Sequence, residues 1–329
     1  MNKINLAIVT GGHAAEKEIS LKSANVVFNN IDKQKYNTFL VDISTMPWTA
    51  TKENNVYNVD FQTFEIVELQ VKFDVAFIAI HGTPAEDGKL QGYFDLLNIP
   101  YSACSVLASA ITFDKDITKK LIEGLGPKMA KSALITTTDF NLDEITEKLS
   151  LPLFVKPNKN GSSYGVSKIK NYNDLEAAIK HALKYDDEVL VEEFVNGSEI
   201  ASGVLERNGK LICLPLTEIK TTNEFFDYEA KYLGKSEELT PAPIAKELTL
   251  KCQEYTKKIY RKLKLSGAVR IDYFLVEDDF YILEVNTIPG LSEESILPQQ
   301  AKAYGFTLSE FFDIILTEAI KKNQNGNFN

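Results

Sequence analysis

Hydrophobic and polar residues along the chain follow patterns that predict both strands and helices. Residues 4–10, 36–43 and 73–80 are short apolar runs typical of strands, and the third is apolar enough to lie inside a parallel sheet. The first run leads through two glycines into residues 14–31, whose apolar spacing suits a helix. A strand, a glycine turn and a helix in this order predict an α/β domain.

The rest of the chain continues this mixture. Helices are predicted at residues 115–126, 173–184, 245–263 and 308–321, and strands at 153–156, 166–169 and 188–194, with a hairpin at 200–205 and 210–216. Residues 102–110 are small and predict a junction, whereas residues 217–235 lack a clear period and predict a long, functional loop. With 329 residues, we expect two or three domains.

Residues 268–286 alternate in two runs around a polar break, which predicts an antiparallel hairpin. If the turn centres near Asp278, Asp272 lies opposite Glu284, with Arg270 and Asn286 on the same face. Two facing carboxylates repel each other unless a cation lies between them, and carboxylate and amide oxygens suit Mg²⁺ that also binds nucleotide phosphates. An ordinary polar face, or a shift in register, is the alternative.

Three turns offer further candidate chemistry. Glu16 follows the glycine turn, where it complements a helix dipole or contacts a substrate ammonium. His81 opens a glycine-rich loop directly after a buried strand, so it either binds a ligand or supports the loop. Residues 157–165 follow Lys156 and lack the P-loop pattern, so they form a loop that folds over phosphates or a plain hairpin loop.

Composition narrows the possible classes. The chain has 44% hydrophobic and 25% charged residues, as in ordinary globular proteins. A net charge of -10 argues against a nucleic-acid surface. Three widely spaced cysteines predict free thiols in a reducing compartment. No apolar run approaches the roughly 20 residues that span a bilayer, and the start does not look like a signal peptide, so we expect a cytoplasmic protein without a membrane partner.

Several segments together resemble the D-alanine:D-alanine ligases, a family of the ATP-grasp superfamily. The matching segments occur in family order over nearly the whole length: GGHAAEKEIS, HGTPAEDGKLQG, FVKPNKNGSSYGVSK, FDYEAKY, RIDYF and EVNTIPGLSEES. The resemblance implies an α/β, three-domain ATP-grasp fold, in which an N-terminal open parallel sheet occupies residues 1–104. A central part at 105–191 and a C-terminal part at 192–329 would then hold ATP between them.

The resemblance also implies roles for individual residues. The residues expected to bind ATP are Lys115, Lys156, Ser162, Glu192, Glu199 and Lys231. Those expected to bind Mg²⁺ are Asp272, Glu284 and Asn286, in agreement with the hairpin argument. Those expected to bind or activate the amino acids are Glu16, His81, Arg270, Gly290 and Ser295. Finally, Glu16, Ser162 and Tyr232 would form a trio that links the loops closing the site.

The implied reaction joins two D-alanine molecules through an acyl phosphate, for peptidoglycan precursor synthesis. ATP and two Mg²⁺ ions, with Mn²⁺ as an alternative, are the expected cofactors, and a homodimer is expected. Tyr232 implies a dipeptide rather than a D-lactate ester, although Leu291 and Ser292 depart from the family's usual residues near the second substrate. Another ATP-grasp carboxylate–amine ligase, or an inactive nucleotide-binding regulator, is the alternative.

Overall fold

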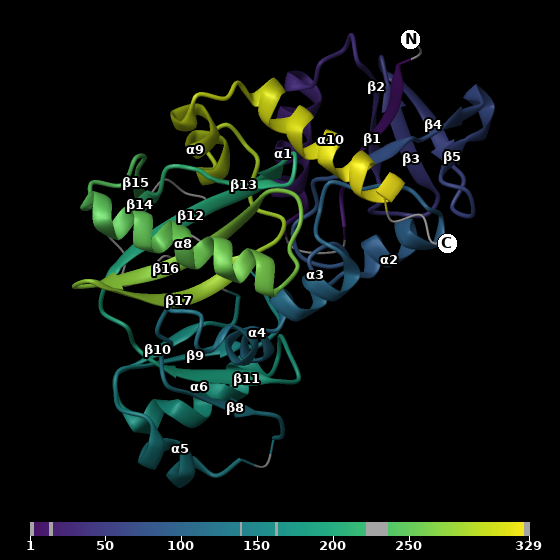
Figure 1. The fold of residues 1–329 in the computed structure, drawn as a ribbon. Coiled ribbons are helices and arrows are strands. Elements are labelled where there is room, and N and C mark those ends of the chain that lie inside the picture. The colour runs from purple at the N-terminus through teal and green to yellow at the C-terminus, as the bar shows by residue number, and fades with distance from the viewer. Residues whose placement is uncertain (1–2, 13–15, 139, 162–163, 222–235, 326–329) are drawn as a thin grey trace.

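The structure is a computed structural model, which describes residues 3–12, 16–138, 140–161, 164–221 and 236–325. Three β-sheets with flanking helices form an α/β arrangement, and the sheet built from the last part of the chain lies between the other two (Figure 1). The predicted fold class is therefore confirmed. Within the described residues, no helix combines the length and the apolar character that crossing a bilayer requires.

The N-terminal sheet has the order β4-β3-β2-β1-β7. β1 (Ile4–Thr10) pairs in parallel with β2 (Tyr36–Asp42) and β7 (Val75–Ile78), as predicted. The antiparallel strands β3 (Trp48–Lys52) and β4 (Asn55–Val59) extend one edge, and β5 (Glu65–Ile66), η1 (Val67–Leu69) and β6 (Val71–Lys72) form a small separate unit. The sheet is therefore mixed, with a parallel centre.

Both faces of β1 are buried from Leu6 onward, which explains the apolar run Leu6–Val9. Leu6 and Ile8 pack into a cluster with α1 (Lys17–Asn30) and α10 (Leu308–Asn325), whereas Ala7 and Val9 pack on the other side with α2 (Lys89–Leu96). Because α10 comes from the end of the chain, this packing ties the C-terminal segment to the N-terminal sheet (Figure 1).

The second sheet is antiparallel, in the order β10-β9-β11-β8. Its strands are β8 (Ser132–Ile135), β9 (Leu153–Pro157), β10 (Ser167–Ile169) and β11 (Val189–Glu193), and its helices are α5 (Leu142–Lys148), η2 (Tyr172–Asp174) and α6 (Leu175–Ala182). Leu153, Val155, Val189 and Val191 bury one face against α5 and α6. Lys156 of β9 and Glu192 of β11 consequently face the other way.

The third sheet contains β12 (Ser198–Arg207), β13 (Lys210–Cys213), β14 (Thr217–Thr221), β15 (Ser236–Leu239), β16 (Val269–Val276) and β17 (Asp279–Asn286). α3 (Val106–Phe113), α4 (Lys115–Ile122) and α8 (Lys246–Lys262) share its core, and α9 (Ile296–Tyr304) precedes α10. The loop prediction for 217–235 is wrong at 217–221, because β14 pairs with β12 and β15. The predicted junction at 102–110 also contains the start of α3.

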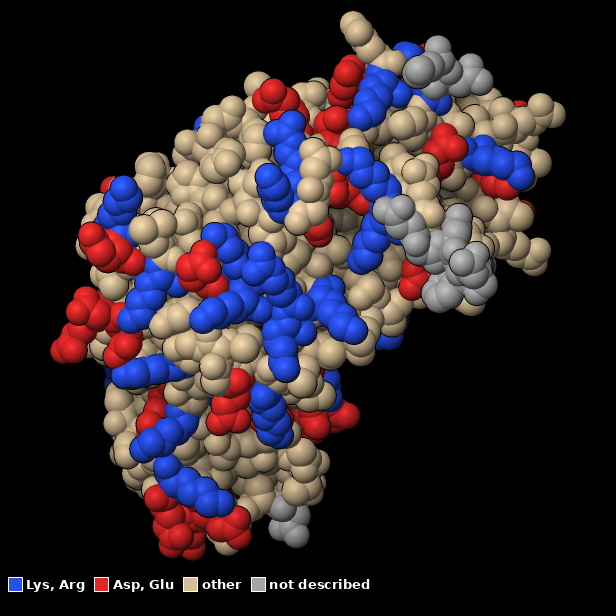
Figure 2. All heavy atoms as spheres, in the orientation of Figure 1, with Lys and Arg blue, Asp and Glu red and all other residues tan. Residues whose placement is uncertain are grey.

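One helix of the third sheet separates apolar and basic residues clearly. α8 buries Cys252, Thr256, Ile259 and Tyr260. Lys246, Lys258, Arg261 and Lys262 are exposed on its other side. Figure 2 shows Lys and Arg side chains gathered over this helix. An acidic chain therefore still carries a local basic surface, which is the solvent face of an amphipathic helix.

Candidate active site

The hairpin of β16 and β17 brings the predicted polar residues together. Arg270 pairs with Asn286 and Asp272 with Glu284 in the strand register, as the alternation predicted. Val269, Ile271 and Tyr273 point into the hydrophobic core, so the intervening polar residues face away from it. The register is interrupted only after Asp272, which keeps all four polar residues in phase.

Arg270 and Asp272 form an ion pair inside the protein. Arg270 Nη2 lies 2.8 Å from Asp272 Oδ2, and Arg270 Nε donates to Oδ1 at 2.8 Å. Asp272 is 1% exposed. Burial opposes the charge of Arg270, but the Asp272 carboxylate raises the pKa of the guanidinium, so Arg270 stays cationic.

The same face has the donor set of a magnesium site. Asn286 Nδ2 donates to Asp272 Oδ2 at 2.8 Å and to Glu284 Oε1 at 3.5 Å, so the amide lies between two carboxylates. Among the described residues, no group of three His, Cys, Asp or Glu side chains forms a metal site. Two carboxylates and an amide nevertheless fit Mg²⁺, which takes few protein ligands and completes its shell with water and phosphate oxygens.

A cavity of about 390 Å³ opens beside this hairpin. Its lining includes Arg270, Glu284 and Asn286 from the hairpin, together with Glu16, His81, Lys115, Gly290 and Ser295. Pockets of this size accommodate small ligands. The structure thus brings residues from the N-terminal loops, α4, β16, β17 and the start of α9 to one cavity.

Glu16 and His81 lie at the N-terminal side of the cavity. Glu16 is the N-cap residue of α1 but makes no side-chain capping hydrogen bond, and it is 7% exposed. His81 is held by α1, because Ser20 Oγ accepts its backbone N–H at 3.0 Å and Ser23 Oγ lies 3.2 Å from its Nε2. Burial and the nearby Arg270 lower the pKa of His81 to about 4, so its ring is neutral at pH 7.

Glu86 is a partly buried acid in the same cavity that the sequence pattern did not single out. Its Oε1 lies 4.0 Å from His81 Nδ1. Burial, and then the charge of Glu16, raise the pKa of Glu86 to about 8, so its carboxyl is mostly protonated at pH 7. The signal in the sequence was its place in the loop HGTPAEDG, five residues after His81.

Gly290 and Ser295 frame the opposite side. A Cβ atom on Gly290 would lie 2.8 Å from Ser295 Oγ, so only glycine lets these two segments approach so closely. Ser295 Oγ lies 2.7 Å from Ser292 Oγ, and Ser295 is the N-cap residue of α9. The partial positive charge at a helix N-terminus favours an anionic group here.

Two lysines expected at the phosphates have different surroundings. Lys115 lines the cavity and donates from Nζ to the carbonyl of Asn160 at 2.6 Å. Lys156 lies outside the cavity lining and pairs with Glu192, which also accepts from Lys119 Nζ at 2.6 Å. Lys119 was not predicted, because nothing in the sequence pattern relates α4 to β11.

Glu199 is 9% exposed on β12, opposite Phe274 of β16, and its charge helps to raise the pKa of Arg270. It lies outside the cavity lining, as do Glu192 and Asp272. Ser162, Lys231 and Tyr232 lie outside the described residues, so the predictions made for them stay predictions.

Comparison with known proteins gives consistent results. Two family models match, "D-ala D-ala ligase N-terminus" over residues 5–104 and "D-ala D-ala ligase C-terminus" over residues 125–317. A D-alanine--D-alanine ligase of Flavobacterium johnsoniae is 45% identical over 312 residues, covering 94% of this chain and 97% of the relative. One of Bacteroides fragilis is 42% identical over 320 residues, covering 95% and 98%.

Solved structures agree in fold. The VanG D-Ala:D-Ser ligase from Enterococcus faecalis has a TM-score of 0.87 and 34% identity, covering 97% of this chain and 100% of that one. The D-alanine--D-alanine ligase from Bacillus anthracis complexed with ATP has a TM-score of 0.80 and 28% identity, covering 98% and 99%.

Proposed function

The chain belongs to the D-alanine--D-alanine ligase family, and on this premise we propose that its cavity joins two D-alanine molecules at the expense of ATP. The observation that carries the proposal is the convergence of Glu284 and Asn286, the partly buried Arg270 and the N-terminus of α9 on one cavity. The balanced reaction converts ATP and two D-alanine molecules into ADP, phosphate, a proton and D-alanyl-D-alanine, a precursor for peptidoglycan.

Binding of the amino acids follows from the charges around the cavity. The Glu16 carboxylate attracts the ammonium of the first D-alanine, and neutral His81 lies beside it. Ser295 and the N-terminus of α9 attract the carboxylate of the second D-alanine. Tyr232 and Ser162 are proposed to link the closing loops to Glu16, as the family resemblance implies.

The chemistry has two steps. The first D-alanine carboxylate attacks the γ-phosphorus of ATP, giving an acyl phosphate and ADP. The deprotonated amine of the second D-alanine then attacks the acyl carbon, and phosphate leaves with its electron pair. Arg270 and the backbone N–H of Gly290 are proposed to stabilise the oxyanion between these events, and the presence of both residues in the cavity lining supports this role.

Nucleotide and metal binding use the other predicted residues. Lys115, Lys156 and Lys231 would contact phosphates, and Glu192 and Glu199 would hold the adenine and ribose. Asp272, Glu284 and Asn286 would hold Mg²⁺, after the Asn286 amide turns its oxygen toward the metal. When bound, Mg²⁺ (two ions, or Mn²⁺ in its place) offsets charge on the transferring phosphoryl group.

We also propose a three-part organisation and a cytoplasmic homodimer, as the family resemblance implies. The expected ranges are 1–104, 105–191 and 192–329, and the extent of β11 to Glu193 favours a boundary directly after that strand. Velocity sedimentation tests the assembly, and a monomer at micromolar concentration would contradict it.

The decisive experiment is an ATP-dependent coupling assay with D-alanine as donor and D-alanine, D-serine, D-lactate or L-alanine as acceptor at neutral pH. We expect D-alanyl-D-alanine and one phosphate per dipeptide. Predominant D-lactate ester would contradict the acceptor assignment. Phosphate release with other amino acids but not with D-alanine would favour a different carboxylate–amine ligase.

A further inference from the structure

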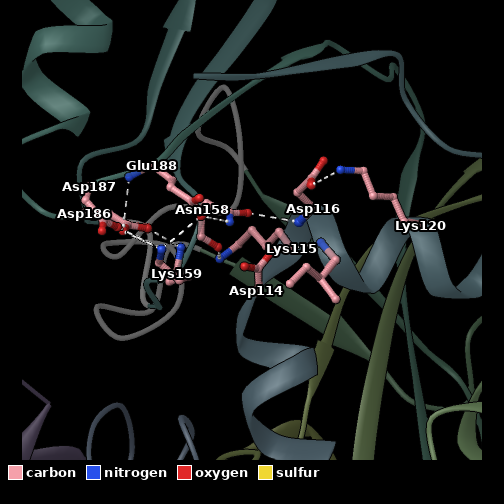
Figure 3. A network of polar contacts seen from close by, with 10 residues as sticks. Asp114, Lys115, Asp116, Lys120, Asn158, Lys159, Asp186, Asp187 and Glu188 are labelled. Atoms are coloured by element: carbon pink, nitrogen blue, oxygen red, sulfur yellow. Dashed lines mark hydrogen bonds and ion pairs between the residues drawn. The ribbon is translucent and has the colours of Figure 1, made fainter. Parts of the chain in front are cut away.

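Asn158, directly after β9, is a buried amide whose polar groups all have partners. It is 0% exposed. Its backbone N–H donates to the carbonyl of Glu188 at 2.9 Å, and its Nδ2 donates to Glu188 Oε2 at 2.9 Å. Its Oδ1 accepts the N–H of Asp116 at 3.0 Å, and its carbonyl accepts the N–H of Lys115 at 3.3 Å. One residue therefore joins three segments that are distant in the sequence (Figure 3).

The first of these segments is the start of α4. The first N–H groups of a helix have no partner inside the helix. Here Asn158 accepts those of Lys115 and Asp116, and Asp114 Oδ1 accepts that of Ile117 at 2.9 Å. The position of the Lys115 backbone, and so of its side chain, is set by an amide from another sheet.

The second segment is the loop after β9, where Lys115 points. Lys115 Nζ donates to the carbonyl of Asn160 at 2.6 Å, and Lys115, Asn160 and Gly161 all line the cavity. Asn158 therefore holds the start of the helix that carries the lysine, and it directly precedes the loop that the lysine contacts.

The third segment precedes β11 and gives the amide a fixed direction. Hydrogen bonds from Lys159 and Asn158 lower the pKa of Glu188, so it remains a carboxylate at neutral pH. A carboxylate only accepts hydrogen bonds, whereas the Asp116 N–H only donates. The Asn158 amide must keep its nitrogen toward Glu188 and its oxygen toward α4.

We propose that Asn158 is a positioning residue for nucleotide binding, holding the Lys115 ammonium and residues 160–161 where they meet the triphosphate. This inference rests on the proposed function of the cavity. A merely structural residue would affect folding alone, so the test must separate the affinity of the folded protein for nucleotide from its stability.

The chain offers a matched set of variants. Asn158→Asp places a carboxylate against that of Glu188 while keeping an acceptor for Asp116. In the double variant Asn158→Asp/Glu188→Gln, the new glutamine amide donates to the new carboxylate, and the total charge of the pair returns to the original value. Glu188→Gln alone retains an acceptor for Asn158. Asp187→Asn changes a neighbouring partner of Lys159 that does not contact Asn158.

The measurements are the dissociation constant of MgATP by calorimetry without D-alanine, the KM for D-alanine, and thermal unfolding. We expect Asn158→Asp to weaken MgATP binding by about tenfold or more, as for loss of a charge-assisted hydrogen bond. The KM for D-alanine should change much less, and the double variant should regain most of the affinity. Glu188→Gln, which keeps an acceptor for Asn158 but no longer fixes the direction of its amide, should weaken MgATP binding less than Asn158→Asp, and Asp187→Asn should stay near wild type.

Two results would overturn the proposal: folded Asn158→Asp with wild-type MgATP affinity, or a double variant as weak as Asn158→Asp. If Asn158→Asp does not fold, Asn158→Ser removes the amide donor without adding charge, and unchanged MgATP binding in that variant would also reject the role. Wild-type protein that binds MgATP but forms no dipeptide would refute the proposed function. The role of Asn158 in MgATP binding could still be tested in that case.

Discussion

Replacing Glu192 with Gln tests how much the Glu192 carboxylate stabilises the protein through its ion pairs with two lysines. The Glu192 carboxylate is 9% exposed and lies between Lys119 and Lys156, which come from α4 and β9. Burial opposes its charge, but the two lysines outweigh burial and lower its pKa from 4.5 to about 2. The ionised form is therefore strongly favoured in the folded protein.

The pKa shift sets the size of the effect. Glu192 ionises more readily when folded, so its contribution is fully present above the unfolded pKa near 4.5 and is lost as pH falls toward 2. At about 1.4 kcal/mol per pKa unit, it contributes about 3 kcal/mol at pH 7. Glu192→Gln should lower the free energy of unfolding by about that amount, because two buried lysines lose their charged partner.

Urea unfolding of both proteins at pH 7 and pH 3 measures this contribution. The difference in unfolding free energy between the wild type and Glu192→Gln should fall at pH 3 to about half of its value at pH 7, since the ionised Glu192 contributes less stability there. Glu193→Gln is the control, because Glu193 pairs with Lys131 only at 3.8 Å and near the surface, and it should cost about 1 kcal/mol or less. A difference that does not change with pH would refute the assignment.

Three further predictions concern the cavity. Asp272→Asn should lower turnover about 100-fold or more, and it should also destabilise the fold, since Arg270 loses its ion-pair partner. Phosphate release at increasing Mg²⁺ tests the turnover, and urea unfolding tests the stability. Unchanged turnover would reject the metal role of Asp272. The wild type should lose stability as pH rises from about 4.5 to 8, because the raised pKa of Glu86 makes its ionisation unfavourable in the folded protein. Glu86→Gln should abolish this loss, and an equal pH dependence of both proteins in urea unfolding would contradict the prediction. Ser295→Ala should raise the KM of the second D-alanine more than that of the first, and steady-state kinetics with equal effects on both would argue against its placement.

The elements that the sequence predicted well are those whose pattern is set locally. β1 occupies the predicted residues 4–10, and because both of its faces are buried from Leu6 onward, four apolar residues follow one another there. The hairpin of β16 and β17 and the pairing of Asp272 with Glu284 were predictable from the alternation and the polar break near Asp278. The one-residue shift in register between Asp272 and Tyr273, which sets Asp272 opposite Glu284, was not predictable from that pattern.

The contribution of Asp272 to stability was not predictable. The hairpin pattern assigns its side chain to a magnesium site and does not indicate whether the fold depends on it. The structure shows it 1% exposed and bonded to Arg270, so the same carboxylate also stabilises the protein. Burial of a residue on the polar face of a hairpin depends on what covers that face, and no local pattern reports it.

The contacts that the sequence did not predict join distant segments. Lys119 meets Glu192 across 73 positions, and Asn158 meets Asp116 across 42. Neither Lys119 nor Asn158 stands out in its own segment, because a lysine in a helix and an asparagine in a loop are both usually exposed to solvent. β14 was missed for a related reason, because TEIKT is short and polar and becomes a strand only through its neighbours β12 and β15.

The balance of charge around the cavity explains why the reaction needs a divalent cation. Among the described residues, its lining contains six glutamates but only three basic residues, Lys22, Lys115 and Arg270. Arg270 is already paired with Asp272, and the raised pKa of Glu86 keeps one glutamate mostly neutral at pH 7. The remaining surplus of negative charge suits the ammonium group of an amino acid but repels a triphosphate. We therefore expect the site to bind nucleotide more tightly with Mg²⁺ than without it, and Asp272 and Glu284, which lie opposite each other, are the acids that such a cation would neutralise.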